Sequence, residues 1–343
     1  MILAEDYNKF IKLFSCCILV NGNSRSVIYD LQREDYSLVP NYLYEIFISP
    51  LKRNLNELIE ESSIHLKKYL IEYFDFLLEN EFAFLCTSEE YEMFPPIDLT
   101  LDEPYDITNA IIDINQTSKH SYKKIFIELE ELGCRNIQLR FYDSIEINSL
   151  IEVLNNTIDL NIHEIDIFIK FYKGIPIQIL KKLCKNNCRI RTIYLHSSGK
   201  FKVICQGKKI HGNIVMIKDK INKESCGFIH PFFFKVDLLL FSEAKKFNSC
   251  LYKKISIDTL GNIKNCPSMN KSFGNCNIET LKNVAKDQEF KRIWYICKDQ
   301  IKVCKDCEFR YMCSDCRCFI EDKNDIYSKP LKCSYNPYNP LAK

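Results

Sequence analysis

The sequence predicts an α/β protein in three parts, and three observations support this. Residues 1–90 hold short β-rich runs followed by amphipathic helices. Residues 105–245 alternate apolar strands with helices, and residues 246–343 carry closely spaced cysteines. Strands that alternate with helices of this kind are typical of βα units around a parallel sheet. We therefore expect three domains with these bounds, and a linker at residues 91–104 between the first two.

Composition and the start of the chain argue against several classes of protein. The net charge is +2, which gives no basic surface for nucleic acid. The first residues, MILAEDYNKF, include acids where a signal peptide is cationic. The most apolar run, 228–241, contains Lys235 and Asp237 and is too short to span a bilayer. We expect a cytoplasmic protein without a nucleic-acid or membrane partner. There, paired thiols are more often metal ligands than disulfides.

Turn and periodicity signals divide the first domain into strands and helices. Gly22, Asn23 and Ser24 separate two β-rich runs, and Pro40 ends a third. Asn54 and the glutamate three residues later form a capping-box pattern, which predicts the start of a helix. The expected strands are residues 16–21, 26–32, 35–40 and 81–87, and the expected helices are residues 55–62 and 65–79.

Part of this domain resembles a known peptide-binding family. The stretch SVIYDLQREDYSLVPNYLYEIF is similar to the PqqD-like precursor-peptide recognition element, which has a winged-helix-like arrangement. Domains of that family bind a leader peptide as an added strand, so that main-chain hydrogen bonds supply the affinity. The resemblance implies that Tyr36, Ser37 and Leu38 form the peptide-binding edge and that helix 65–79 forms its wall. The alternative is that the same aromatic residues only fill a small core.

The middle domain is predicted to contain about four to six βα units, too few for an eight-stranded barrel. Continuous apolar runs predict parallel strands, because both faces of such strands are covered by helices. The expected strands are residues 109–115, 136–142, 164–171 and 190–198, with helices at residues 122–134, 147–156 and 176–187.

This middle domain resembles a degenerate partial (βα) barrel of the radical S-adenosylmethionine type. The similarity rests on the stretch FIELEELGCRNIQLRFYDSIEINSLIEVLNN. That family requires a Cys-x3-Cys-x2-Cys loop after its first strand, but here no cysteine lies between Cys86 and Cys134. Its glycine-rich turn after the second strand is replaced by Phe141, Tyr142, Asp143 and Ser144. Both departures imply that the chain binds no S-adenosylmethionine and does not work as a radical enzyme.

No catalytic residue is evident in the sequence. Cys184 and Cys188 share one helical face, but position 191 is arginine where a third cysteine would be required, so free thiols are expected. The six histidines are scattered and form no pattern with a carboxylate or a serine. Whether the chain is itself an enzyme therefore stays open.

The last domain carries the strongest chemical signal. Gly261 predicts a hairpin turn that brings Cys250 and Cys266 together. The run ETLKNVAKDQEFKRIWYIC, residues 279–297, predicts a helix after this hairpin. Iron–sulfur cubanes and structural zinc both take about four thiolates. Zinc modules usually separate their cysteine pairs by a dozen or more residues, whereas Cys307 and Cys313 are only six positions apart. We favour iron–sulfur clusters over zinc or free thiols. The expected metal ligands are Cys250, Cys266, Cys304, Cys307, Cys313, Cys316, Cys318 and Cys333.

The spacing of these cysteines resembles the SPASM domain, which holds two auxiliary [4Fe–4S] clusters. The resemblance implies one cluster on Cys304, Cys307, Cys313 and Cys333, and another on Cys250, Cys266 and either Cys316 or Cys318. One position departs, because Arg317 stands where the family has a cysteine. The fourth ligand of that other cluster stays open: it is Cys276, or Cys297, or the fourth iron has no protein ligand.

Together the three parts resemble the SPASM-domain peptide maturases of grasp-with-spasm systems. This resemblance implies maturation of a ribosomally synthesised peptide, with the precursor peptide and an ATP-grasp ligase as partners and without cleavage of S-adenosylmethionine. The chain would be the maturase or its accessory. Two other functions stay open: an iron–sulfur electron-transfer protein, and a structural zinc-binding interaction module.

Overall fold

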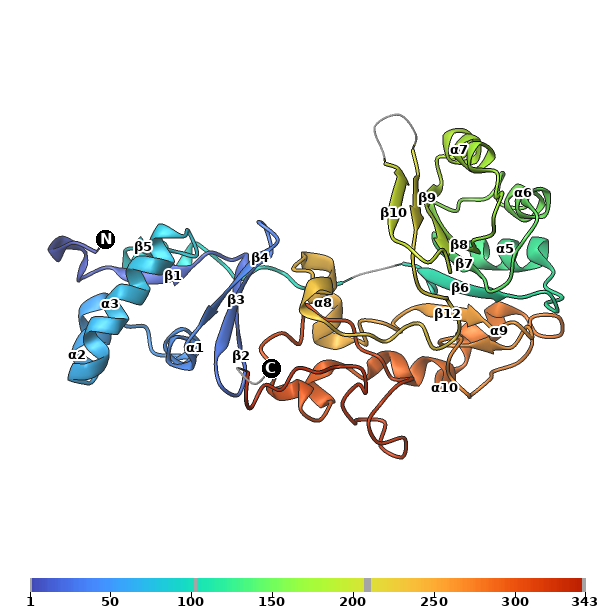
Figure 1. Cartoon of the computed structure of the whole chain (residues 1–343). Coiled ribbons are helices and arrows are strands. Elements are labelled where there is room, and N and C mark those ends of the chain that lie inside the picture. Colours follow the sequence, from blue (N-terminus) through green and yellow to red (C-terminus); the bar gives the residue numbers. More distant parts are fainter. Residues whose placement is uncertain (1, 102–103, 207–210, 341–343) are drawn as a thin grey trace.

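The computed structural model describes residues 2–101, 104–206 and 211–340. Figure 1 shows a small N-terminal domain on one side and a large sheet with its helices on the other. Helix α8 (Leu238–Lys246) lies between them, and the irregular C-terminal segment runs along both. Toward the end of the described residues, the Pro337 carbonyl oxygen accepts a hydrogen bond of 2.9 Å from the Ser24 hydroxyl in the turn after strand β2. The described helices include none with the length and apolar character needed to cross a bilayer.

The N-terminal domain contains two small antiparallel sheets. Strand β1 pairs with β5, and a second sheet has the order β2-β3-β4. The predicted strands and helices are present, whereas β1, α1 and α4 were not predicted. The elements are η1 (Ala4–Asp6), β1 (Phe10–Leu13), β2 (Cys17–Asn21), β3 (Ser26–Asp30), β4 (Asp35–Val39), α1 (Asn41–Ile48), α2 (Leu55–Glu61), α3 (Ile64–Glu79), β5 (Ala83–Cys86) and α4 (Ser88–Glu92).

Capping boxes fix two of these helices. The Asn54 side chain accepts a hydrogen bond from the Glu57 amide at 2.9 Å, and the Glu57 carboxylate accepts one from the Asn54 amide at 2.8 Å. The capping box predicted from the sequence is therefore confirmed. Thr87 and Glu90 make the same pair of bonds at the start of α4, which extends into the predicted linker.

Strand β3 joins the N-terminal domain to the rest of the protein, because both of its faces are buried. On one face Ile28 packs in the helical core with Phe74 of α3. On the other face Tyr29 packs against Phe241 of α8, with ring centroids 5.1 Å apart, and shares its cluster with Phe309 of the cysteine-rich segment. The sheet β2-β3-β4 is thus packed between the N-terminal helices and the C-terminal segment.

The middle of the protein is an open, mostly parallel sheet with the order β10-β11-β9-β8-β7-β6-β12-β13. The six central strands run parallel, and an antiparallel strand ends each side. All four predicted strands are confirmed. The strands are β6 (Asn109–Ile114), β7 (Asn136–Phe141), β8 (Glu164–Lys170), β9 (Ile190–His196), β10 (Lys202–Cys205), β11 (Asn213–Met216), β12 (Lys254–Ile257) and β13 (Ile263–Lys264).

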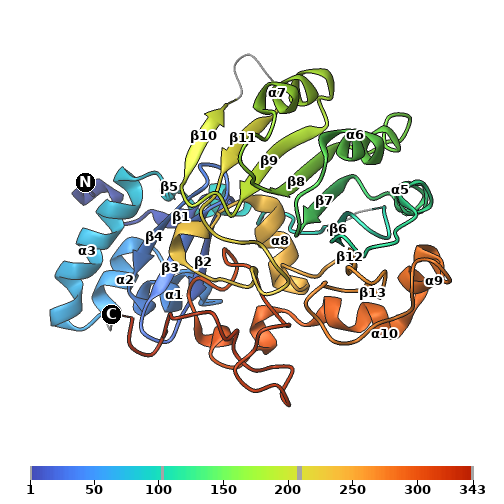
Figure 2. The ribbon, with the colours of Figure 1, turned by 45° about the vertical axis from the view of Figure 1, so that its right-hand side comes forward.

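Helices α5 (Tyr122–Glu131), α6 (Ile147–Asn155) and α7 (Ile177–Asn186) lie along one face of this sheet (Figure 2). The predicted hairpin after Cys250 is present as β12 and β13, and β12 pairs with β6. The first strands of the predicted cysteine domain therefore extend the sheet of the middle domain. The main core is built from the apolar residues of these strands and helices.

The long helix expected at residues 279–297 is not continuous. It is replaced by α9 (Leu281–Lys286), α10 (Gln288–Lys291) and the 3₁₀ turn η3 (Arg292–Tyr295). Asp287 between α9 and α10 has extended backbone angles, and its carboxylate accepts a hydrogen bond from the Glu289 amide at 2.8 Å. An aspartate side chain that hydrogen-bonds backbone amides in this way favours the start of a new helix, so α9 ends and α10 begins at Asp287. Two further 3₁₀ turns follow, η4 (Lys298–Gln300) and η5 (Cys304–Asp306).

Candidate cysteine sites and a peptide-binding edge

The cysteines near the C-terminus gather in two groups. Burial and the Cys313 sulfur raise the pKa of Cys304, to about 11, and that of Cys307, while Cys333 acts on both Cys304 and Cys313. We call Cys304, Cys307, Cys313 and Cys333 the second cysteine group. These are the four ligands that the resemblance implied for one cluster, and the structure brings them together.

Tight turns position this second group. Cys304 begins η5 and Cys307 ends it, with the Cys307 amide donating to the Cys304 carbonyl oxygen at 3.0 Å. Val303 before them has φ 68°, a left-handed conformation that is uncommon for a β-branched residue. Cys333 is brought in by a parallel bridge with Ile229. Cys304, Cys307 and Cys313 thus lie in one stretch that begins at the strained Val303, whereas Cys333 comes from a later segment that pairs with Ile229.

The first cysteine group contains five thiols. A hydrogen bond with Cys226, together with burial, raises the pKa of Cys266, and the Cys250 sulfur acts in the same direction. Burial and the Cys250 and Cys226 sulfurs raise the pKa of Cys316; burial, Cys316 and Cys226 raise that of Cys318 to about 12. The structure therefore gathers Cys226, Cys250, Cys266, Cys316 and Cys318, and it places both Cys316 and Cys318 at this site.

Cys226 was missed by the sequence reasoning. Its sulfur is 3.6 Å from the Ser268 hydroxyl oxygen, and it lies close enough to Cys266 for a hydrogen bond between the two thiols. A Cβ built on the next residue, Gly227, would lie 2.9 Å from the Cys316 sulfur. The signal available in the sequence was this Cys-Gly pair, whose glycine lets the backbone approach another sulfur.

The fourth ligands suggested from the sequence lie elsewhere. Cys276 is at the Gly261 turn, where burial raises its pKa and Lys124 lowers it. Cys297 caps η4 and hydrogen-bonds within that turn. The structure therefore points to Cys226, and not to Cys276 or Cys297, as the additional thiol of the first group.

Arg317 explains the departure from the expected spacing. Its side chain is buried and turns away from both groups, donating to the carbonyl oxygens of Ile326 and Ser328 at 2.8 Å each and to Asp315 at 2.7 Å. It therefore closes the loop at residues 326–328 rather than binding metal. The neighbours on either side of it supply the thiols instead.

The second group is surrounded by a buried charge network that lacks one anion. Lys298, Asp315 and Arg317 are 2%, 0% and 2% exposed. Two cations and one carboxylate give the network a net charge of +1, which is costly to bury without a further anion. Lys298 Nζ is 3.6 Å from Asp315 Oδ1 and 3.9 Å from the Cys304 sulfur. Burial opposes the charged form, yet Cys313, Asp315 and Cys304 raise the pKa of Lys298. A thiolate of Cys304, as in a metal-bound cysteine, would supply a further negative charge beside the Lys298 ammonium.

Within the described residues, neither cysteine group holds three ligand atoms as close together as one zinc ion requires. Zinc bonds of 2.3 Å in a tetrahedron place the sulfurs about 3.8 Å apart. One set of three Cys, His, Asp or Glu side chains in the described ranges has all its ligand atoms within 4.8 Å, namely Cys16, Cys17 and Asp30.

The Cys16, Cys17 and Asp30 set has a structural explanation. Asp30 accepts hydrogen bonds from the amides of Gln32 and Arg33 and from the Arg33 guanidinium. The carboxylate therefore caps the turn between β3 and β4. Cys17 is buried with Ile28 in the core of the N-terminal domain, where a free cysteine packs as a small apolar side chain.

Among the described residues, β4 is an edge strand of its sheet at the place where peptide binding was predicted, and the Tyr36 amide on it donates to the Asp35 carboxylate at 2.8 Å. Gly22 N–H donates to Arg25 O, and Leu31 N–H donates to Cys16 O, so the odd-numbered residues of β3 bond β2. The even-numbered residues of β3 then bond β4, and the register leaves the backbone groups of Tyr36 and Leu38 pointing outward. Their side chains are 37% and 43% exposed.

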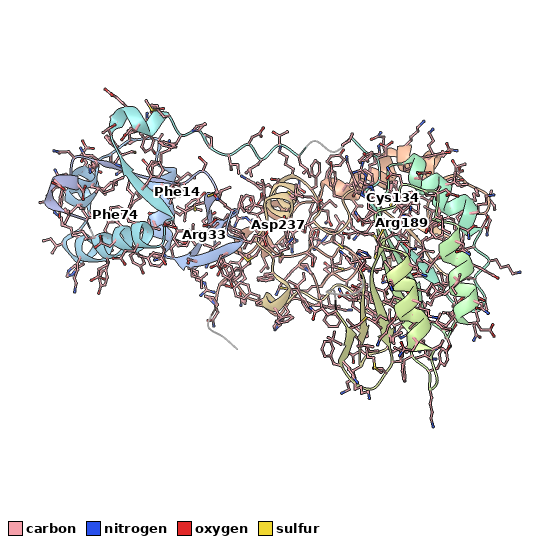
Figure 3. The ribbon with its side chains drawn as sticks, turned by 90° about the horizontal axis from the view of Figure 1, so that it is seen from above. Phe14, Arg33, Phe74, Cys134, Arg189 and Asp237 are labelled. Atoms are coloured by element: carbon pink, nitrogen blue, oxygen red, sulfur yellow. The ribbon has the colours of Figure 1, made fainter. Side chains whose placement is uncertain are left out.

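The predicted wall helix is α3, which buries Leu70, Phe74 and Leu77 in the domain core. Its C-terminal end is fastened to the turn before β4, because Arg33 donates to the carbonyl oxygens of Asn80 and Glu81 at 2.8 and 3.0 Å. In Figure 3 the N-terminal domain, marked by Arg33 and Phe74, is separated from the sheet domain by α8, whose N-cap is Asp237.

The sheet that carries β4 is bonded directly to the second cysteine group. The Tyr29 hydroxyl donates to the Glu308 carbonyl oxygen at 2.8 Å, and Arg25 pairs with the Glu308 carboxylate at 2.7 Å. The Asn23 amide donates to Asp306 O at 2.8 Å. Burial and the Cys313 and Cys307 sulfurs raise the pKa of Tyr29. The hydrogen bonds of Tyr29, Arg25 and Asn23 thus attach β3 and the turn before it to the loop that holds these cysteines.

The ends of β6 and β7 are closed by a buried ion pair. Asp113 and Arg140 are 1% and 4% exposed and make two bonds of 2.6 and 2.8 Å, and the Tyr142 hydroxyl also donates to Asp113. His120 in the following loop bonds the Asp113 carbonyl oxygen at 2.9 Å. A cavity of about 580 Å³ opens beside these strand ends and is lined in part by Asp143.

The remaining middle-domain thiols behave as core or surface side chains. Cys184 is buried against the sheet, and burial raises its pKa to about 12, whereas Cys188 is exposed. Burial likewise raises the pKa of Cys134 to about 12. Helix α7 ends at Asn186 and the next residue is extended, so Cys188 lies beyond the helix and the prediction that it shares a helical face with Cys184 is wrong.

No protein-family model matches the chain, and no curated protein matches it. Among solved structures, the crystal structure of Streptococcus suis SuiB bound to S-adenosylmethionine is similar, with 10% sequence identity and a TM-score of 0.32. The alignment covers 93% of this chain and 98% of SuiB. A TM-score of this size does not establish a common fold, so the likeness carries no argument about cofactor or activity.

Proposed function

We propose that this chain acts in the maturation of a ribosomally synthesised peptide, binding the precursor along β4 and holding two iron–sulfur clusters in its cysteine groups. The observation that carries the proposal is the direct attachment of the β4 sheet to the second cysteine group through Tyr29 and Glu308. A peptide captured at this edge would start beside the cysteine-rich segment.

The exposed edge of β4 supports the peptide half of the proposal. Natural proteins usually protect edge strands with charges, proline or bulges, since unpaired backbone groups invite another strand. Here Tyr36 and Leu38 direct backbone groups outward and expose aromatic and aliphatic side chains, and a peptide would have to displace the Asp35 carboxylate from the Tyr36 amide. An extended peptide would gain main-chain hydrogen bonds at this edge and side-chain contacts beside it.

The buried charges support the cluster half of the proposal. A cubane held by thiolates carries negative charge, which would balance the net +1 of Lys298, Asp315 and Arg317. The proposed ligands of one cluster are the four members of the second group. The other cluster would use Cys226, Cys250, Cys266 and either Cys316 or Cys318. When bound, such clusters can store an electron or brace the loops that hold them.

We place the chemistry on the peptide with an ATP-grasp ligase partner rather than with this chain alone. The loops after β6 and β7 carry no thiol, and Asp113, Arg140 and Tyr142 occupy the strand ends. Because these side chains occupy the strand ends, they support the proposal that the chain does not cleave S-adenosylmethionine. The chain would then hold the precursor in the orientation that the ligase needs.

The decisive experiment is co-expression of an ATP-grasp ligase and its precursor peptide, with and without this chain. The proposal expects the mass of the modified precursor only when all three are present. An identical modified mass without this chain would reject its role in maturation. Metal analysis of the anaerobically purified chain tests the clusters separately, since colourless, zinc-rich protein would reject them.

A further inference from the structure

Beside each cysteine group, the ammonium of a lysine lies against a sulfur. Lys254, on β12, has its Nζ 3.7 Å from the Cys250 sulfur in the first group. Lys298, on η4, has its Nζ 3.9 Å from the Cys304 sulfur in the second group. The two lysines come from unrelated elements, so one local motif does not account for both contacts.

Burial makes these contacts informative. Lysine is rarely fully buried unless it is paired, yet Lys298 is 2% exposed. Its carboxylate neighbour Asp315 lies 3.6 Å away and is shared with Arg317, whose bond to the same carboxylate is shorter at 2.7 Å. The sulfurs of Cys304 and Cys313 are further partners of the ammonium, and they would carry negative charge as thiolates bound to a cluster.

We propose that Lys254 and Lys298 are the charge partners of the two clusters, and that each holds the reduction potential of its cluster above the value that an apolar side chain would allow. The inference rests on the proposed function, because it requires clusters in both groups. Reduction adds one negative charge to a cluster that its thiolates already make anionic. A fixed positive charge at short range in a buried site favours that reduced state.

The two sites should differ in how strongly they depend on their lysine. The first group has further cations, since Arg140 and Lys332 also act on the Cys226 sulfur. In the second group Lys298 is the buried ammonium in contact with a ligand sulfur, while Arg317 is turned toward the carbonyl oxygens of Ile326 and Ser328. Loss of Lys298 should therefore have the larger effect.

The test uses the full chain, reconstituted anaerobically with iron and sulfide and titrated with dithionite. The variants are Lys298→Met, which keeps the length and removes the charge, Lys298→Arg as the matched control, and Lys254→Met. Iron and sulfide content is measured first, and the potentials are then read from the EPR signals of the reduced clusters.

For Lys298→Met we expect one of the two clusters to shift to a lower potential. The shift should change the ratio of oxidised to reduced cluster at least tenfold at a fixed potential, which is about 59 mV for one electron. Lys254→Met should shift the other cluster by less, and Lys298→Arg should behave as wild type. Loss of one cluster from Lys298→Met with retention in Lys298→Arg also supports the charge role.

Two outcomes overturn the inference, and they differ in what else they reject. If the wild-type chain takes up two clusters and both methionine variants keep wild-type potentials, only the role of the lysines fails. If the wild-type chain takes up no iron and sulfide, the proposed clusters fail and the inference fails with them.

Discussion

The hydroxyl of Tyr29 donates a 2.8 Å hydrogen bond to the backbone carbonyl oxygen of Glu308. Tyr29 lies on β3 and is fully buried, while Glu308 directly follows Cys307 of the second cysteine group. A strand of the N-terminal domain and the loop of a candidate metal site are thereby one packed unit. A substitution in the strand or in the loop should therefore lower the stability of both.

Tyr29→Phe should lower the free energy of unfolding by about 1–3 kcal/mol, because it leaves the buried carbonyl without a donor. The register offers a matched control, since Tyr36 is the direct partner of Tyr29 across β3 and β4 and is partly exposed. Tyr36→Phe should change the same quantity by less than about 0.5 kcal/mol. Urea unfolding followed by circular dichroism measures both, and equal effects would contradict the role given to this bond.

Leu38→Pro should weaken precursor binding about tenfold or more, which corresponds to about 1.4 kcal/mol. The Leu38 amide points away from β3, so proline removes a donor from the free edge without breaking a bond inside the sheet. Leu38→Ala keeps that amide and is the matched control, expected to lose much less. Fluorescence titration with the labelled precursor gives both affinities. Unchanged binding by a folded Leu38→Pro protein would move the peptide to another surface.

Sequence reasoning succeeded where the signal was local. Apolar runs located β6 to β9, and the capping pair Asn54 and Glu57 located α2, because such elements depend on neighbouring residues. It failed for the helix expected at residues 279–297, since one aspartate cap outweighed an amphipathic pattern. The pairing of β12 with β6 joins segments far apart in the chain, and no local signal predicts it.

The candidate site was predicted in the same uneven way. Spacing identified the cysteines that lie within one short loop, such as Cys304, Cys307 and Cys313. Cys226 was missed because helix α8 and its flanking segments separate it from Cys250, so its place in the group depends on the tertiary fold. The buried lysine beside Cys304 was missed for the same reason.

Asp258 should make the hairpin that carries Cys266 sensitive to acid. Burial raises the pKa of Asp258, but hydrogen bonds from Lys264 and Asn262 outweigh burial and hold it below the ordinary value of 3.8. A carboxyl with a lowered folded pKa contributes stability above its unfolded pKa, and this contribution is lost as the pH falls through the folded value. The window is therefore below about pH 4.

Asp258→Asn should cost about 1–3 kcal/mol of unfolding free energy at pH 7, and the difference from wild type should shrink below about pH 4. Asp98→Asn is the control, because the pKa of Asp98 is also lowered but by local bonds with Thr100 in an exposed segment. It should leave the stability unchanged. A wild-type-to-variant difference for Asp258→Asn that grows in acid would reverse the assigned sign.

Cys226→Ser should remove one of two clusters from the anaerobically reconstituted chain. Two [4Fe–4S] clusters hold about eight irons, so the variant should keep about four. Cys276→Ser is the matched control: this thiol is also buried, but it lies at the Gly261 turn outside both groups, and the variant should keep all eight. Cys316 and Cys318 are alternatives for one ligand position, so Cys316→Ser and Cys318→Ser should each retain both clusters, whereas neither of these two sulfurs replaces Cys226 at its own position. Full iron content in Cys226→Ser, or loss in Cys276→Ser, would restore the ligand set suggested by spacing alone.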